Sequence, residues 1–211
     1  IHCGLVGSEM CIRDRVRHGQ SQWNLENRFT GWYDAKLTDK GYEEAQKAGL
    51  LIKNLGLKFN YGFTSYQTRA IKTFETILKT SDIKILNITK AWQLNERHYG
   101  DLQGLNKDET AKKHGKEQVM IWRRSYDIPP PPQKRNDPEH PLNSKLYKEI
   151  DPKLIPDSES LKDTYNRTIP YYQQNVEPLL IKSENVLIAA HGNSLRLSLI
   201  HISEPTRPQC I

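Results

Sequence analysis

Asn185-Val186-Leu187-Ile188-Ala189-Ala190-His191-Gly192 is the stretch that decides the fold of this chain. Residues 186–190 are apolar without alternation, which is typical of a strand buried on both faces in a parallel sheet covered by helices. The residues from Gly192 onward are typical of a helix start. We therefore expect His191 at the carboxyl end of a strand, where open α/β sheets bind ligands.

The pattern around this strand alternates between helices and strands. Thr38 can cap a helix over residues 39–55 that ends at Gly56. Pro129 to Pro132 exclude regular structure and lie in a long irregular insert at about 100–158. Further helices are expected at 67–78, 106–114, 117–125 and from about 160 onward, and further strands at 61–64 and 83–88. This order predicts one α/β domain with three layers, helices on both faces of a mostly parallel sheet.

The overall charge limits the classes of partner that the chain could bind. The chain has 211 residues and a net charge of +6, so nucleic acid, an acidic membrane or a phosphorylated metabolite could bind it. Its Arg and Lys residues stand beside Gly, His and Asn, whereas nucleic-acid surfaces carry basic runs interleaved with aromatic residues. This favours a small, multiply charged substrate, with neither nucleic acid nor membrane as a partner.

Cysteine usage indicates the compartment. The three cysteines are Cys3, Cys11 and Cys210, so the interior of the chain has no thiol for a structural disulfide or a CxxC metal site. A reduced, cytoplasmic setting is expected. Residues 1–15 lack the apolar core of a secretory signal. We also expect no catalytic metal, because no HExxH or HxH string is present.

A second histidine, in Val16-Arg17-His18-Gly19-Gln20-Ser21, could face the same pocket as His191. A neutral imidazole nitrogen can accept a phosphoryl group near pH 7, and neighbouring cations such as Arg17 and Arg69 offset the charge on its oxygens. Either histidine alone is more often structural, so only their joint occurrence supports this chemistry.

Several motifs together are similar to the histidine phosphatase superfamily: Arg17-His18-Gly19, Ser65-x-x-x-Arg69-Ala70 and His191-Gly192. Longer blocks resemble its phosphoglycerate mutase branch. They are Phe29-Thr30-Gly31-Trp32, Leu94-Asn95-Glu96-Arg97-His98-Tyr99-Gly100, Leu102-Gln103-Gly104-Leu105-Asn106-Lys107 and Trp122-Arg123-Arg124-Ser125-Tyr126-Asp127-Ile128-Pro129-Pro130. The resemblance implies a doubly wound α/β sheet.

The resemblance also implies roles for individual residues. His18 would be the phosphorylated nucleophile, with Arg17, Arg69 and His191 holding the phosphoryl group and Glu96 moving the proton. Substrate would bind at positions matching Asn24, Thr30, Gly31, Tyr99, Lys107, Arg123, Arg124 and Asn193. Simpler explanations stay open: Glu96 could be a surface carboxylate paired with Arg97, and the two adjacent arginines could belong to a solvated helix face.

The implied activity interconverts 3-phosphoglycerate and 2-phosphoglycerate in glycolysis and gluconeogenesis, primed by 2,3-bisphosphoglycerate. A phosphatase of the same superfamily is the runner-up, followed by an inactive fragment. The family is often dimeric, so a homo-oligomer is possible.

The ends of the chain fall outside the resemblance. We expect residues 16–197 to form the mutase-like domain, and residues 1–15 and 198–211 to be extraneous sequence attached to a truncated gene. The charged residues 13–15 would be costly in a central strand, which predicts a sheet with incomplete edges.

Overall fold

A four-stranded parallel sheet forms the centre of the computed structural model, which describes residues 13–203. The expectations for residues 1–12 and 204–211, including those on all three cysteines, lie outside the described residues. The strands are β1 (Arg13–Arg17), β2 (Tyr61–Thr64), β3 (Asn87–Lys90) and β4 (Val186–Ala190), in the spatial order β1-β4-β2-β3.

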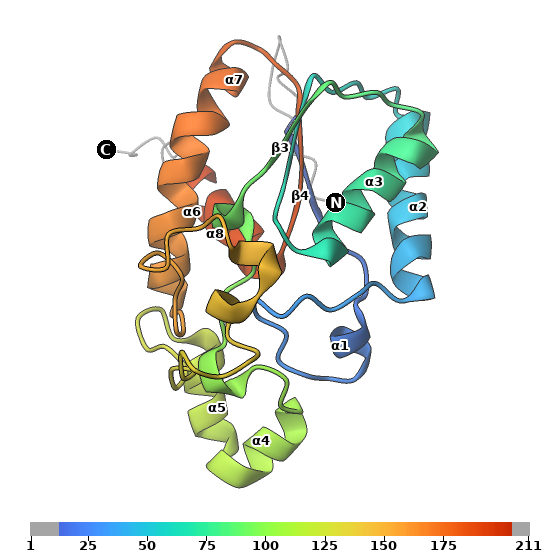
Figure 1. The fold of residues 1–211 in the computed structure, drawn as a ribbon. Helices are drawn as coiled ribbons and strands as arrows, with labels where there is room; N and C mark the ends of the chain where they lie inside the picture. The colour runs from blue at the N-terminus through green and yellow to red at the C-terminus, as the bar shows by residue number, and fades with distance from the viewer. Residues whose placement is uncertain (1–12, 204–211) are drawn as a thin grey trace, which may run out of the picture.

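Helices cover both faces of this sheet, which confirms the three-layer prediction. Helices α2 and α3 lie on one side, and α6 and α8 lie on the other (Figure 1). The α-helices are α1 (Gln22–Leu25), α2 (Asp39–Asn54), α3 (Thr68–Ser81), α4 (Lys107–His114), α5 (Lys116–Arg124), α6 (Leu161–Asn175), α7 (Glu177–Ile181) and α8 (Gly192–Ser203). Short 3₁₀ turns occur at η1 (Trp92–Leu94), η2 (Gly100–Leu102), η3 (Pro141–Asn143) and η4 (Lys145–Tyr147).

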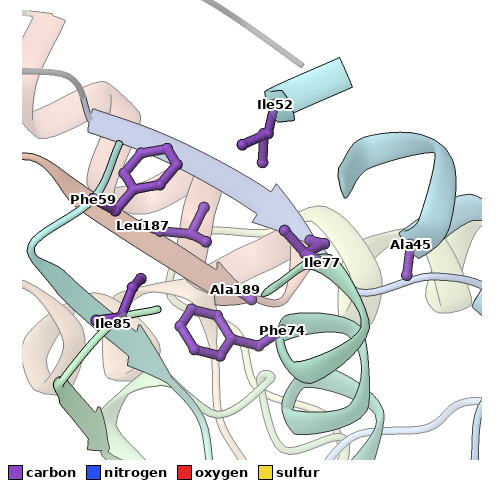
Figure 2. Packing of buried hydrophobic residues seen from close by; sticks show 8 residues of the cluster. All are labelled: Ala45, Ile52, Phe59, Phe74, Ile77, Ile85, Leu187 and Ala189. Carbon is purple, nitrogen blue, oxygen red and sulfur yellow. The ribbon is translucent and has the colours of Figure 1, made fainter. Parts of the chain in front are cut away.

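Strand β4 is buried along its whole length, as its apolar sequence predicts. Leu187 and Ala189 pack into the cluster beneath α2 and α3 (Figure 2). Val186, Ile188 and Ala190 belong to the cluster on the other face, with residues of α6. Successive side chains of a strand point to opposite faces, so an uninterrupted apolar run fills both cores.

Helix α2 follows the sequence prediction closely. The Thr38 hydroxyl oxygen accepts the N–H of Gly41 at 3.1 Å and caps the first turn. Gly56, just after the helix, has φ of +65°, a conformation that glycine adopts without strain. The strand predicted at 61–64 is confirmed as β2, and the helix predicted at 67–78 is present as α3, three residues longer at its end.

The strand predicted at 83–88 was placed too early. Strand β3 spans Asn87–Lys90 and all four of its residues are exposed. Its pairing begins with Asn87 opposite Tyr61 of β2. The alternating Ile83 and Ile85 instead pack, as part of the connection, against the core cluster beneath α3. Core packing of a loop therefore produced the alternation that suggested a strand.

Strand β1 lies at an edge of the described sheet and pairs with β4. Val16 packs against the cluster beneath α2 and α3. The side chains of residues 13 and 14 lie outside the described ones, and Arg15 is half-buried. An edge strand can leave part of its surface in water, and the cost expected for the charged run before Val16 stays a prediction.

The insert predicted from its prolines has little regular structure. Helices α4 and α5 form its first part and extend away from the sheet (Figure 1), and 3₁₀ turns occur in the rest. Helix α6 then begins at a reciprocal cap, in which Ser160 Oγ accepts the N–H of Asp163 and Asp163 Oδ2 accepts the N–H of Ser160. Within residues 13–203, no helix has the length and apolar character that a membrane span requires.

Replacing Leu187 with alanine tests the central role of β4. Leu187 is fully buried, so Leu187→Ala should lower the free energy of unfolding by about 2–5 kcal/mol in urea denaturation. Leu86→Ala is the matched control, because Leu86 is 94% exposed and its loss should change stability by less than about 0.5 kcal/mol. Equal losses would contradict this account of the core.

Candidate active site

The carboxyl ends of the four strands bring the predicted site residues to one edge of the sheet. His18 follows β1, Ser65 follows β2 and His191 follows β4. The chain after β3 runs through η1 to Glu96. Parallel strands end on the same side of a sheet, so segments far apart in the sequence meet there.

The two histidines predicted to share a pocket do lie together. Their ring centroids are 4.9 Å apart, with the ring planes inclined at 57°. The Nδ1 of His18 lies 2.7 Å from the carbonyl oxygen of Gly19, which can only accept, so Nδ1 carries the proton. The lone pair of the neutral His18 ring is therefore on Nε2, the nitrogen available as a nucleophile.

Ser65 holds the second imidazole. Its Oγ lies 2.8 Å from His191 Nε2 and accepts the N–H of Gln67 at 3.2 Å. The Ser65 hydroxyl can donate to Nε2, and in that tautomer the His191 proton lies on Nδ1. His191 Nδ1 is buried and has no hydrogen-bond partner among the described residues, so this N–H can serve an anion.

Both imidazoles are held neutral by their surroundings. Burial and the Arg69 guanidinium, with a smaller effect from Arg17, hold the pKa of His18 well below its usual value. Burial, Arg69 and His18 itself do the same to the pKa of His191. Because both causes disfavour a second positive charge, His18 keeps a free lone pair at neutral pH.

Arg69 is a fully buried cation. It donates to the carbonyl oxygens of Tyr33 at 2.8 Å and Gly31 at 2.9 Å, and to Gln67 Oε1 at 3.1 Å. Its Nε has no hydrogen-bond partner among the described residues. Burial lowers its pKa while the charge of Glu96 opposes that shift. A buried positive charge with a spare donor is suited to an anion.

Glu96 is fixed by hydrogen bonds to its carboxylate. Its Oε1 accepts the backbone N–H of Arg97 at 2.9 Å and the side-chain amide of Asn193 at 2.9 Å. The guanidinium of Arg97 is buried and lies over the ring of Tyr99. The hydrogen bond between Glu96 and Arg97 thus involves the backbone N–H of Arg97, and Glu96 lines a pocket.

Two hollows lie beside His18 and Glu96 and share Arg17 and Asn24. One, of about 360 Å³, is lined by Arg17, His18, Gly19, Gln20, Asn24 and Glu44. The other, of about 270 Å³, is lined by Arg17, Asn24, Arg28, Thr30, Glu96, Tyr99, Lys107, Gly192, Asn193 and Arg196. Burial, then Arg123 and Arg17, lowers the pKa of Lys107. The second hollow therefore combines four cations with a single carboxylate.

The remaining predicted residues differ in their distance from the two hollows. Gly31 has φ of +54°, and a Cβ there would lie 2.6 Å from Gln103 Oε1. Its carbonyl oxygen accepts from Arg69, so Gly31 shapes the loop behind the site. Arg123 influences Lys107 by its charge but does not line either hollow. Arg124 ends α5 and is also absent from both linings.

Sequence reasoning missed other contributors. Gln67 is fully buried, accepts from Arg69 and from the backbone N–H of Glu96, and donates to Gly31. Arg28 and Arg196 line the second hollow. Arg196, in the first turns after His191, was visible in the sequence as a cation near the carboxyl end of β4. Gln67 carried no such signal, since its role depends on tertiary contacts.

The described part of the chain shows no cluster of side chains that could bind a metal ion. No group of three or more His, Cys, Asp or Glu residues there is arranged to hold a metal ion. The expectation of a metal-free site stays a prediction.

Comparison with known proteins identifies the superfamily of this chain and then its family. The sequence model of the histidine phosphatase superfamily (branch 1) matches residues 16–141. The 2,3-bisphosphoglycerate-dependent phosphoglycerate mutase of Hydrogenobaculum sp. (strain Y04AAS1) is 51% identical over 196 residues, covering 93% of this chain and 79% of that protein. The 2,3-bisphosphoglycerate-dependent phosphoglycerate mutase 2 of Lactiplantibacillus plantarum is 53% identical over 181 residues, covering 86% and 79%. The chain belongs to the histidine phosphatase superfamily and, within it, to the family of 2,3-bisphosphoglycerate-dependent phosphoglycerate mutases.

Solved structures support the fold. A phosphoglycerate mutase from Bacillus anthracis str. Sterne superposes with a TM-score of 0.67 at 22% identity, covering 94% of this chain and 82% of that one. A protein titled mycobacterial hydrolase 1 gives a TM-score of 0.66 at 21% identity, covering 90% and 78%. At these identities the likeness concerns the fold alone.

The depressed histidine pKa values predict how stability depends on pH. Below about pH 6.5 the unfolded chain binds protons that buried His191 does not, so the free energy of unfolding should fall as pH falls. His191→Asn should make this slope shallower by up to about 1.4 kcal/mol per pH unit. Urea denaturation between pH 7 and 5 measures it, and parallel slopes for the two proteins would contradict the assignment.

Proposed function

We propose that this chain interconverts 3-phosphoglycerate and 2-phosphoglycerate through a phosphohistidine at His18, in glycolysis and gluconeogenesis. The observation that carries the proposal is the pair of neutral imidazoles 4.9 Å apart beside a buried guanidinium, with His18 Nε2 free to attack. The names of the relatives supply the substrate, and we propose 2,3-bisphosphoglycerate as the primer that loads His18.

The site residues are suited to stabilise a phosphoryl group during its transfer. His18 Nε2 forms the bond to phosphorus as the bond from phosphorus to the substrate oxygen breaks. Arg17, Arg69 and His191 would stabilise the charge on the three remaining oxygens. Support comes from the unpaired Nε of Arg69 and Nδ1 of His191, both buried. Preorganised donors of this kind lower the barrier because they need no rearrangement during the reaction.

Glu96 would transfer the proton to and from the substrate oxygen. The oxygen that leaves the phosphoryl group must gain a proton, and the hydroxyl that attacks phosphohistidine must lose one. Asn193 and the backbone N–H of Arg97 hold one oxygen of the Glu96 carboxylate, which leaves the second oxygen for exchange with the substrate. Since Glu96 lines the hollow with Arg17, one carboxylate can serve both directions of transfer.

The second hollow suits a substrate with a carboxylate and a further phosphate. Lys107, Arg28 and Arg196 line it together with Arg17. We propose that Asn24, Thr30, Tyr99 and Asn193 orient the bound acid, with Gly31 shaping the loop, and that Arg123 and Arg124 act from the rim. The Asn24 side-chain oxygen accepts from Ser21, so its amide N–H₂ remains the group that can donate to an anion.

The domain assignment follows the same reasoning. We propose that residues 16–197 form the catalytic domain and that the insert at about 100–158 helps to enclose the substrate. Lys107, the first residue of α4, supports this, since it belongs to that insert and lines the hollow. The substrates would be small phosphorylated three-carbon acids; a cytoplasmic location and a homo-oligomer remain part of the proposal.

Replacing His18 and Glu96 separates the two chemical roles. His18→Ala should abolish acid-labile phosphoenzyme after incubation with 2,3-bisphosphoglycerate, as followed by intact-protein mass spectrometry. Glu96→Gln should still become labelled while kcat for isomerisation falls roughly 10²- to 10⁴-fold. Normal labelling of the His18 variant would overturn the assignment. Phosphate release by the wild-type chain in place of isomerisation would favour the phosphatase alternative.

Lys107 tests the anion-binding hollow. Lys107→Met should raise the KM for 3-phosphoglycerate roughly tenfold or more, because a hydrogen bond to a charged group is lost. It should also reduce the rise in Tm that inorganic phosphate produces. Lys113→Met, at an exposed position on the same helix, is the control and should match the wild-type chain. Equal behaviour of both variants would remove Lys107 from the site.

A further inference from the structure

A buried ion pair lies behind the segment that carries Glu96. Arg167, on α6, is paired with Glu159, and their side chains are only 8% and 2% exposed. The contact is bidentate along one edge of the guanidinium, because Arg167 Nε donates to Glu159 Oε1 and Nη2 donates to Oε2 at 2.9 Å. A bidentate pair fixes the plane of the guanidinium as well as its position.

The remaining donors of Arg167 bind the backbone just before and at Glu96. Nη1 donates to the carbonyl oxygen of Gln93 at 2.8 Å, and Nη2 donates to that of Glu96 at 3.0 Å. Both nitrogens also reach the carbonyl oxygen of Asn95, at 3.2 Å. The carbonyl group of Gln93 lies within η1, and those of Asn95 and Glu96 follow its end. Backbone acceptors at the end of such a turn need partners from outside it.

Glu159 binds the backbone on the other side of Glu96. Its Oε2 accepts the N–H of His98 at 2.8 Å, and its own backbone N–H donates to the carbonyl oxygen of His98 at 2.9 Å. The ion pair therefore holds residues 93–98 at several points, with Glu96 in the middle. The carboxylate of Glu96 can only be placed as accurately as this segment.

The chemistry of the contact requires arginine. A lysine ammonium is a point charge and cannot reach several carbonyl oxygens and both oxygens of Glu159 from one plane. The Arg167 guanidinium also lies over the ring of Trp32, 5.5 Å from its centroid. Arg167 acts by charge on His191 too, where it is a minor cause of the lowered pKa. Lysine would keep that charge and lose the forked contacts.

We propose that Arg167, held by Glu159, is a positioning residue that fixes the backbone around Glu96 and so sets where its carboxylate meets the substrate oxygen. This inference rests on the proposed function, since it gives Glu96 the proton-transfer role. Arg167 lines neither hollow over the site, so it acts through Glu96 and not by binding substrate.

A double-mutant cycle tests the inference. Arg167→Lys should lower kcat for isomerisation roughly 10- to 100-fold, the size of effect expected from a small displacement of a reacting group. The KM should change by less than about threefold, because the binding residues stay in place. In a Glu96→Gln background the same substitution should have little effect on kcat, since the group it positions is already gone.

Arg135→Lys is the matched control. Arg135 pairs with Asp157 through one nitrogen at 2.8 Å, and the two side chains are 52% and 36% exposed, so kcat should equal that of the wild-type chain. Circular dichroism and Tm establish that each variant is folded. If Arg167→Lys does not fold, Glu159→Gln enters the same cycle with the same expectations.

Equal fold-losses from Arg167→Lys in the two backgrounds, or an unchanged kcat, would overturn the inference and leave the proposed function intact. The proposed function fails on a different result, namely a folded wild-type chain that neither isomerises phosphoglycerate nor becomes phosphorylated at His18. That result would also overturn this inference, because the inference rests on the proposed function.

Discussion

The backbone hydrogen bond from the N–H of His18 to the carbonyl oxygen of Ala190, 3.0 Å long, joins the ends of β1 and β4. It is the last link in a parallel pairing that aligns Arg17 with Ala190. The residue after each strand is a histidine. The two imidazoles lie beside each other because their strands pair in this register, and a shift of one residue would turn one of them away from the site.

The site is built from positive charge that the fold has removed from water. Arg69 is fully buried and is bound mainly by carbonyl oxygens, which satisfy its donors without neutralising it. This charge and burial together keep both imidazole rings neutral. The same arrangement that would attract a phosphoryl group thus also keeps the nucleophile reactive, since a protonated imidazole could not attack phosphorus.

Arg69 and Arg167, two of the buried arginines, have different roles. The charge of Arg69 lowers the pKa of His18. Arg167 is paired with Glu159, and its other N–H groups donate to the backbone around Glu96. The desolvation cost of burying an ion pair can exceed the attraction between its two charges. A pair kept in such a place is better explained by the geometry that it enforces than by the stability that it adds.

The sequence by itself determined the parts of this protein that depend on local patterns. The apolar run of β4, the Thr38 cap of α2 and the prolines of the insert each identify an element from neighbouring residues alone. The longer motif blocks identified the family. Local patterns failed at β3, where Ile83 and Ile85 alternate because they pack in a loop, and strand pairing with β2 begins only at Asn87.

Only the tertiary structure decided how distant residues meet. The tautomer of His18 depends on the Gly19 carbonyl oxygen, the orientation of His191 depends on Ser65, and the carboxylate of Glu96 depends on Asn193. Gln67 and Arg167 have no motif of their own and gain their roles from the groups that they contact. The physical reason is that hydrogen bonds and desolvation act between neighbours in space, and spacing along a chain does not record them.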